Sequence, residues 1–159
     1  MSIKVYTDGS AKGNPGPGGY GIVMLSDGGH RKEVASGFRK TTNNRMELLS
    51  VIVALEMLKA RPMDVLVFSD SKYVVNAVEK KWVFNWEKTF FNKKKNVDLW
   101  KRFLIIYRKH NVRFVWVKGH ANNVENERCD RLAVAAAEAK EHHEIDRGYE
   151  ALSHTRPLL

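Results

Sequence analysis

The sequence lacks several features that would place the protein in a particular class. Cys129 is the single cysteine, which excludes an internal disulfide and fits a reducing compartment. The six histidines are scattered, so no structural zinc spacing is present. No apolar run approaches the roughly 18 residues of a membrane span, and the first residues lack a signal peptide's basic region and apolar core. These absences predict a cytoplasmic protein without a membrane partner.

Acidic residues are also fewer than basic ones. The 159 residues include 27 Lys and Arg against 18 Asp and Glu, a net charge of +9. Clustered basic side chains favour a polyanionic partner because they neutralise phosphates and release counterions. A basic surface that serves only solubility is the alternative that composition leaves open. The length and the hydrophobic content of 43% fit one domain with one core.

The order of predicted elements indicates an α/β fold. Strand-like alternation in residues 3–7, 20–25 and about 31–39, separated by turn residues, predicts an antiparallel meander. Helical patterns and short apolar strands then alternate; the helices cover 44–59, 71–78, 98–109 and about 126–140, and the strands cover 64–68 and 112–117. This order predicts a five-stranded mixed sheet, antiparallel on one side and parallel on the other, flanked by helices. The polar segment after Lys140 is expected to be loose.

Residues Gly16–Gly21, "GPGGYG", have the G-x-G-x-x-G spacing of a dinucleotide-binding loop. That fingerprint requires a helix directly after the glycines. Residues 19–29 are instead β-branched and aromatic, and they stop at a turn. Pro15 and Pro17 also favour extended or turn geometry. We therefore predict a glycine-rich turn between two strands.

Four carboxylates occupy unusual positions. Asp8 and Asp70 each end a predicted strand, and open α/β sheets bind ligands at the carboxyl ends of their strands. Glu47 lies on its predicted helix nine positions before Glu56, hence on the opposite side from that solvent-facing acid. Asp130 precedes three inward-facing apolar residues at helical spacing. Because buried carboxylates are costly unless paired, hydrogen-bonded or bound to metal, the two helical acids need a partner.

Each acid also has a simpler explanation. Asp8 could form a turn, Asp70 could cap a helix, Glu47 could form a capping box with Asn44, and Asp130 could favour a helix N-terminus. Four acids converging on one sheet edge are better explained by a shared ligand. Oxygen ligands select Mg²⁺ or Mn²⁺, and two such ions can activate water against a phosphodiester. An acidic centre within a basic surface predicts a nuclease.

Four segments together resemble type 1 ribonuclease H of the bacterial type: "YTDGSAKGNPGPGGYG", "TTNNRMELL", "FSDSKYV" and "WVKGHANNVENERCDRLA". The resemblance runs from about Ile3 to Ala139. It implies a catalytic domain over residues 1–141, followed by a polar C-terminal tail over 142–159. It also implies a monomeric endonuclease that hydrolyses the RNA strand of RNA/DNA hybrids and leaves 5′-phosphate and 3′-hydroxyl ends.

The same resemblance assigns roles to individual residues. Two Mg²⁺ ions, or Mn²⁺ in their place, are held by Asp8, Glu47, Asp70 and Asp130. His120 assists the proton transfers or product release. Asn14, Asn43 and Asn44 contact 2′-hydroxyls and base edges across the minor groove, and Thr42 helps to hold a DNA-strand phosphate. Lys72 stands where this bacterial group usually has glutamine, which replaces a hydrogen-bonding group with a charge.

Residues 80–101 correspond to the basic protrusion, or handle, of bacterial members. Seven lysines against Glu87 and Asp98 give this segment a net charge of +5, more than half of the chain's total of +9. This concentration weakens the solubility explanation. Trp82 and Trp86 are expected to stack on sugar or to cover a phosphate pocket on the DNA strand. Packing of one of them against the domain is equally compatible with the sequence.

Two other functions remain as alternatives. A DNA-processing nuclease of the same fold would use similar acids, but the handle and the "NNRME" segment oppose it. A catalytically silent nucleic-acid-binding module would have no need of four inward carboxylates.

Overall fold

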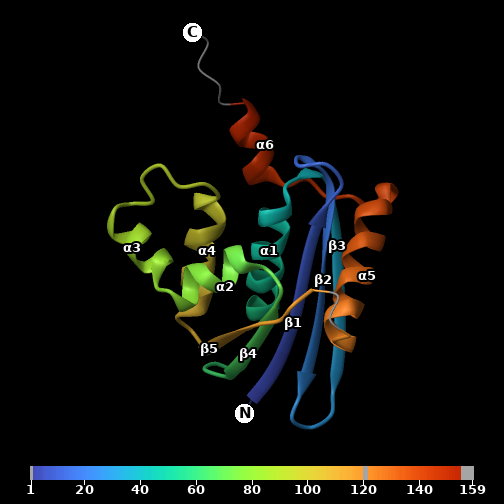
Figure 1. Cartoon of the computed structure of the whole chain (residues 1–159), viewed down its shortest axis with the longest axis vertical. Coiled ribbons are helices and arrows are strands. Elements are labelled where there is room, and N and C mark those ends of the chain that lie inside the picture. The colour runs from blue at the N-terminus through green and yellow to red at the C-terminus, as the bar shows by residue number, and fades with distance from the viewer. Residues whose placement is uncertain (1, 120–121, 155–159) are drawn as a thin grey trace.

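The computed structural model describes residues 2–119 and 122–154. Its centre is a mixed five-stranded sheet in the order β3-β2-β1-β4-β5, as Figure 1 shows. The first three strands are antiparallel, whereas β4 and β5 run parallel to β1. The strands are β1 (Ser2–Ala11), β2 (Gly16–Ser26), β3 (Arg31–Thr41), β4 (Asp64–Ser69) and β5 (Asn111–Trp116). This arrangement confirms the fold class predicted from the sequence.

Helices cover both faces of the sheet. On one face α1 (Asn43–Glu56) packs on β1 and β2, and α4 (Val97–Tyr107) packs on α1. On the other face α5 (Val124–Glu138) lies across β1, β2 and β3 (Figure 1). The remaining helices are α2 (Lys72–Glu79), α3 (Trp82–Lys88), the 3₁₀ turn η1 (Lys140–His142) and α6 (Arg147–His154). Every predicted strand and helix is present, and α3 and α6 add to them.

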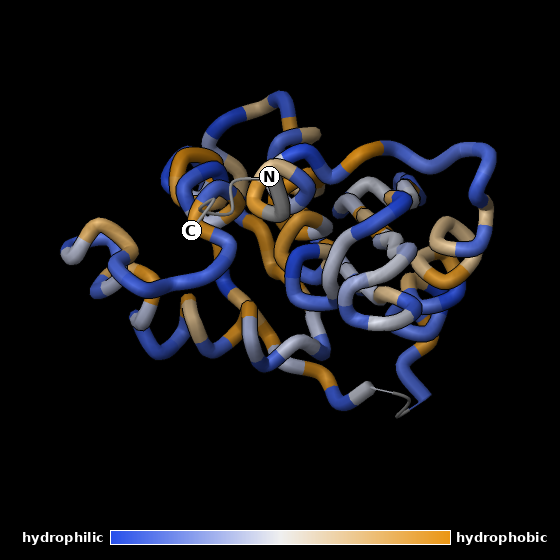
Figure 2. Tube along the Cα trace, turned by 90° about the horizontal axis from the view of Figure 1, so that it is seen from above, coloured by the Kyte–Doolittle hydropathy of each residue, from blue (hydrophilic) through white to orange (hydrophobic). Residues whose placement is uncertain are grey.

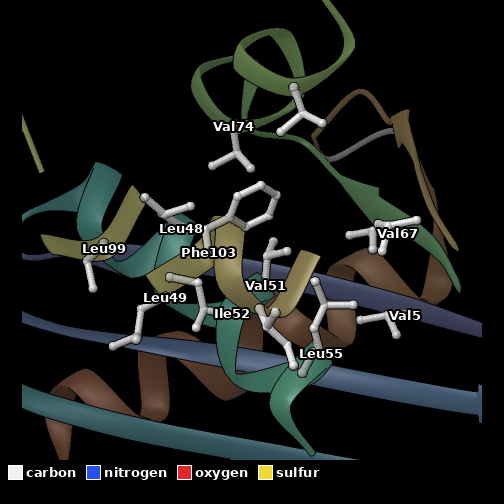
Figure 3. Packing of buried hydrophobic residues seen from close by; sticks show 14 of the residues in the cluster. Val5, Leu48, Leu49, Val51, Ile52, Leu55, Val67, Val74, Leu99 and Phe103 are labelled. Atoms are coloured by element: carbon white, nitrogen blue, oxygen red, sulfur yellow. The ribbon is translucent and has the colours of Figure 1, made fainter. Parts of the chain in front are cut away.

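The main core lies between the sheet and helices α1 and α4. Val5 and Val67 from the strands face Val51 and Leu55 of α1, and Phe103 of α4 closes the layer (Figure 3). All five side chains are fully buried. Helix α1 is apolar around most of its circumference because it is enclosed by both the sheet and another helix. By contrast, the outermost loops are mainly hydrophilic (Figure 2).

The predicted turn at Gly16–Gly21 is wrong, because this stretch begins strand β2. Gly18 pairs with Ala11, so the turn occupies the residues just before Gly16. The missing side chain at Gly21 serves helix packing: a Cβ there would lie 2.3 Å from the carbonyl oxygen of Cys129 in α5. Glycine therefore brings α5, the helix that carries Asp130, close to the sheet.

Asp8 does not end its strand, contrary to the sequence-based expectation. Strand β1 continues to Ala11 because its antiparallel partner β2 extends that far. The parallel pairing with β4 stops one residue before Asp8, at Thr7 and Ser69. Asp8 consequently lies at the point where β1 and β4 separate. Ligands of open α/β sheets bind at this point, beyond the carboxyl ends of the parallel strands.

The expectation of a loose tail is wrong for residues 142–154. The amide of Glu144 donates to the Gly37 carbonyl at 2.8 Å, and the Arg39 amide donates back to Glu144 at 3.0 Å. Two residues later Asp146 is buried and paired with Arg45. The polar segment 142–154 is ordered because the Asp146 carboxylate forms an ion pair with the buried Arg45 guanidinium group. Among the helices of the described residues, none combines the length and apolarity that a membrane crossing requires.

Candidate active site

Three carboxylates converge where β1 and β4 separate. Asp8 comes from β1, Glu47 from the early part of α1, and Asp70 directly follows β4. One carboxylate oxygen from each lies within 4.8 Å of the others. Asp8 and Glu47 are only 6% and 4% exposed. The sequence-based placement of Glu47 on the inner side of its helix is therefore confirmed.

Asp130 of α5 joins this cluster from the opposite face of the sheet. It lines one cavity of about 420 Å³ together with Asp8, Glu47 and Asp70. Asp130 is half-buried. The structure thus brings together all four acids that the sequence singled out.

A glycine in β1 sets the distance between two of these acids. The backbone N–H of Gly9 donates to Glu47 Oε1 and also to Asp8 Oδ1, the latter at 3.0 Å. A Cβ at Gly9 would lie 2.4 Å from the backbone nitrogen of Glu47. Only glycine lets the start of α1 approach β1 so closely. The strand backbone therefore orients both carboxylates before any ligand arrives.

Helix capping does not explain the four acids. Thr42 caps α1 by accepting from the Arg45 amide, and Ser71 caps α2 by accepting from the Val74 amide, each at 3.3 Å. The capping box of Asn44 and Glu47, the simpler explanation for Glu47, is therefore absent, because the N-cap of α1 is Thr42. Asp130 is the seventh residue of α5, beyond the first turn in which the helix dipole favours an acid. Asp8 lies inside a strand, not in a turn.

The electrostatics of the cluster favour a cation. Burial and the adjacent Glu47 carboxylate raise the pKa of Asp8 well above its usual range. Burial, with a further contribution from Asp70, raises the pKa of Glu47. Within the described part of the chain, no Lys or Arg forms an ion pair with any of the four acids. Crowded oxygen donors without a basic partner fit a hard divalent ion.

The predicted catalytic residue His120 lies outside the described residues. The segment that leads to it can be placed. Gly119 is adjacent to the acids, since a Cβ at this position would lie 3.0 Å from Asp70 Oδ2. The role assigned to His120 stays a prediction.

Five of the predicted substrate-binding residues line two neighbouring cavities. Asn43, Asn44 and Lys72 line the acid cavity. Asn14, Thr42 and Asn44 line a second cavity together with Lys94 and Lys95 at the end of the handle. Asn44 thus belongs to both. Asn14 Oδ1 accepts from the Asn43 amide at 3.0 Å, which ties the β1–β2 turn to the start of α1.

Lys72 lies over an aromatic residue that the sequence analysis missed. Its Nζ is 5.0 Å from the centre of the Trp116 ring, within the range of a cation–π contact. Trp116 is 43% exposed, and its Nε1 donates to the backbone carbonyl of Asp70 at 3.1 Å. The available signal was a tryptophan at the end of the last strand, directly before the "VKGH" segment.

The two predicted tryptophans of the handle differ in environment. Trp82 is 43% exposed and lies 5.3 Å from Lys80 Nζ, so its ring is accessible to a ligand. Trp86 is half-buried, with its ring centre 5.7 Å from that of Trp100 in the core. This packing agrees with the alternative that one tryptophan anchors the handle. Whether either ring contacts substrate stays a prediction.

A carboxylate cluster at the carboxyl ends of a mixed α/β sheet, beside a basic helical protrusion, defines a divalent-metal-dependent nuclease. The sequence model of the RNase H family matches residues 1–138 of the chain. The chain belongs to the ribonuclease H family.

Known proteins of this family align over most of the sequence. The ribonuclease H of Desulforamulus reducens is 59% identical over 140 residues, covering 85% of this chain and 87% of the relative. That of Shewanella amazonensis is 54% identical over 153 residues, covering 93% and 96%. Among solved structures, LC9-RNase H1, a type 1 RNase H with the type 2 active-site motif, superposes with a TM-score of 0.78 at 33% identity, covering 98% of this chain and 81% of that one.

A second solved structure is LC11-RNase H1 in complex with RNA/DNA hybrid. It has a TM-score of 0.67 at 29% identity, and the match covers 87% of this chain and 99% of that one. These similarities agree with the resemblance seen in the sequence.

Proposed function

We propose that this ribonuclease H hydrolyses the RNA strand of RNA/DNA hybrids with two Mg²⁺ ions held by Asp8, Glu47, Asp70 and Asp130. The observation that carries the proposal is the convergence of these four acids in one cavity that Asn43, Asn44 and Lys72 also line. The hybrid bound to the similar LC11-RNase H1 supports the substrate class. Mn²⁺ is the second ion that suits the same oxygen donors.

The chain's own residues prepare the site for chemistry. When bound, a pair of divalent ions lowers the pKa of water and stabilises charge on a phosphodiester. Gly9 holds the Asp8 and Glu47 carboxylates in place through its single N–H, so little reorganisation is needed on binding. The half-buried Asp70 and Asp130 complete the set at the cavity wall. His120 is proposed to assist proton transfer or product release.

The neighbouring residues are proposed to select the hybrid. Exposed Asn14, Asn43 and Asn44 offer amide groups for 2′-hydroxyls and base edges, the features that distinguish RNA from DNA in a minor groove. Thr42 and the lysines of the handle are proposed to hold DNA-strand phosphates. The ammonium group of Lys72 adds a charge at the edge of the acid cavity.

The proposal is tested with labelled RNA/DNA hybrid, double-stranded RNA, single-stranded RNA and duplex DNA, each incubated with Mg²⁺. We expect cleavage of the hybrid alone and its loss with a chelator or in Asp8→Asn. Asp27→Asn makes the same change at an exposed loop residue and should cleave normally. Cleavage of duplex DNA, or hybrid cleavage that survives the chelator, would overturn the proposal.

We further propose that the protein acts as a monomer in the cytoplasm. Its single cysteine supports a reducing compartment. Sedimentation or light scattering at micromolar concentration should give the mass of one chain, and a stable dimer would contradict the monomer.

A further inference from the structure

The C-terminal segment forms one wall of the cavity that contains Asn14 and Thr42. This cavity has a volume of about 680 Å³ and is bounded on three sides by segments far apart in sequence. The β1–β2 turn and the start of α1 form one side, and the end of the handle forms another. The third side consists of Gly148, Tyr149 and Leu152 of α6. Helix α6 therefore adjoins residues proposed to bind substrate.

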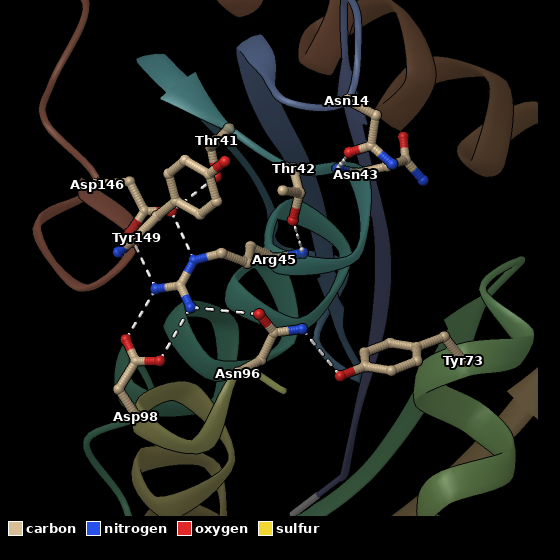
Figure 4. A network of polar contacts seen from close by, with 10 residues as sticks. All are labelled: Asn14, Thr41, Thr42, Asn43, Arg45, Tyr73, Asn96, Asp98, Asp146 and Tyr149. Atoms are coloured by element: carbon tan, nitrogen blue, oxygen red, sulfur yellow. Dashed lines mark hydrogen bonds and ion pairs between the residues drawn. The ribbon is translucent and has the colours of Figure 1, made fainter. Parts of the chain in front are cut away.

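Arg45 anchors this wall. It is 1% exposed, and its guanidinium group donates to both carboxylate oxygens of Asp146 at 2.8 and 2.9 Å. It also donates to both oxygens of Asp98 at 2.9 and 2.7 Å (Figure 4). Thr41 adds a hydroxyl hydrogen bond to Asp146 at 2.6 Å. Arg45 is consequently a structural cation that joins α1, the start of α4 and the C-terminal segment, and it is not available to bind a phosphate.

A glycine lets α6 start directly over this ion pair. A Cβ at Gly148 would lie 2.0 Å from Asp98 Oδ2 and 2.8 Å from Arg45 Nη2. The next residue, Tyr149, donates its backbone N–H to Asp146 Oδ1 at 3.2 Å. The backbone position of Tyr149 is thus fixed by the hydrogen bonds of Asp146 and Arg45.

The same network reaches the acid cavity through Asn96. Its side chain accepts from Arg45 Nη1 at 3.4 Å and donates to the Tyr73 hydroxyl at 3.0 Å (Figure 4). Tyr73 lines the acid cavity beside Lys72. One set of polar contacts therefore connects α6, the end of the handle and the entrance to the candidate active site.

The lining of this second cavity, which contains Asn14, Thr42 and Tyr149, suits a sugar–phosphate backbone. Lys94 and Lys95 line it, with Lys94 Nζ 5.1 Å from the centre of the Trp86 ring. Within the described part of the chain neither forms an ion pair with a carboxylate. The carboxylate of Asp98 also lines it and is held in an ion pair with Arg45. Tyr149 adds a ring that can pack on deoxyribose and a hydroxyl that can donate to a phosphate oxygen.

We propose that Tyr149 is a substrate-binding residue that contacts the DNA strand of the hybrid in this cavity, which Lys94 and Lys95 also line. The inference rests on the proposed function, because it requires that the hybrid occupy the adjacent Asn14 and Thr42 positions. Helix α6 is then part of the substrate-binding surface, and Asp146, Arg45 and Gly148 are positioning residues that hold it there.

The test compares steady-state hybrid cleavage by wild type, Tyr149→Ala and Tyr149→Phe. Loss of one hydrogen bond and one packing contact should raise KM about fivefold in Tyr149→Ala, with kcat nearly unchanged. Tyr149→Phe keeps the ring and should show an intermediate KM. Arg147→Ala is the matched control, because Arg147 is an exposed residue of the same helix that does not line this cavity. Its KM should equal that of wild type.

A second measurement identifies the strand. Methylphosphonate linkages, which carry no charge, are placed one at a time in the DNA strand. At one position the substitution should raise the KM of wild type but have a smaller effect on Tyr149→Ala. An unchanged KM in Tyr149→Ala, or sensitivity to the same substitution in the RNA strand alone, would overturn this inference while leaving the proposed function intact. Failure of wild type to cleave the hybrid would overturn both.

Discussion

Replacing Asp8 with asparagine should stabilise the metal-free protein. Asp8 is 6% exposed and lies beside Glu47, Asp70 and Asp130. Burial and the charge of Glu47 raise its pKa from an ordinary value of 3.8. A group whose folded-state pKa is raised contributes stability that is fully present below its unfolded pKa and is lost as pH rises. At pH 7 in chelator, Asp8 therefore opposes folding.

The size of this effect follows from the pKa shift. Keeping a buried carboxyl protonated at pH 7 costs up to about 4 kcal/mol, at roughly 1.4 kcal/mol per pKa unit. Relaxation of the neighbouring acids reduces this figure, so we expect a gain on the order of 2 kcal/mol. For a domain of this size, that corresponds to a rise in Tm of about 4–8 °C. The asparagine oxygen can still accept from the Gly9 N–H, so the local geometry is preserved.

The assay is thermal unfolding followed by circular dichroism in chelator, at pH 7 and at pH 4. The gain in Asp8→Asn should be largest at pH 7 and should mostly disappear at pH 4, where the unfolded chain also begins to protonate this position. Asp27→Asn, an exposed change of the same kind, should leave Tm nearly unchanged. A lower Tm in Asp8→Asn at pH 7, or a larger gain at pH 4, would refute the electrostatic argument.

Three further outcomes are expected. Mg²⁺ should raise the Tm of wild type more than that of Asp8→Asn, because a bound ion offsets the repulsion that the variant already lacks; equal shifts would count against metal binding at this cluster. Gly9→Ala should lower the unfolding free energy by about 2–4 kcal/mol in urea titrations, since its Cβ would overlap the start of α1, and wild-type stability would contradict the close approach. Asp146→Asn should cost about 2–3 kcal/mol by the same measurement because Asp146 is the buried partner of Arg45 and also accepts from the Thr41 hydroxyl. The loss in Asp98→Asn should be smaller because the Asp98 side chain is 44% exposed, and equal losses would contradict this reading.

The four acids were predictable because each carries a local signal. Glu47 and Asp130 have apolar residues at helical spacing beside them, and Asp8 and Asp70 come after short apolar runs. What the sequence could not show was the packing between distant segments. In the sequence Gly21 resembles a turn residue, and its role in the close packing of α5 is visible only in the fold. The end of β1 could not be predicted either, because its pairing with β2 extends to Ala11 whereas its pairing with β4 stops at Thr7.

The C-terminal segment was mispredicted for a similar reason. Residues 142–154 have few apolar residues, which usually indicates a loose tail. Their order depends on Asp146 meeting Arg45, a residue 101 positions earlier in the chain. The hydrophobic periodicity of the sequence contains no information about an ion pair between residues so far apart. The Trp116 contacts with Lys72 and the Asp70 carbonyl likewise depend on the parallel pairing of β4 with β5.

The most direct test of the central claim uses one hybrid with different fluorescent labels on its RNA and DNA strands. Incubation with the protein and Mg²⁺, followed by denaturing electrophoresis, should show a shortened RNA strand with 3′-hydroxyl ends and an intact DNA strand. A chelator added before the protein should abolish cleavage. A cut DNA strand, or RNA cleavage that persists without divalent ions, would contradict a metal-dependent ribonuclease H built on these four acids.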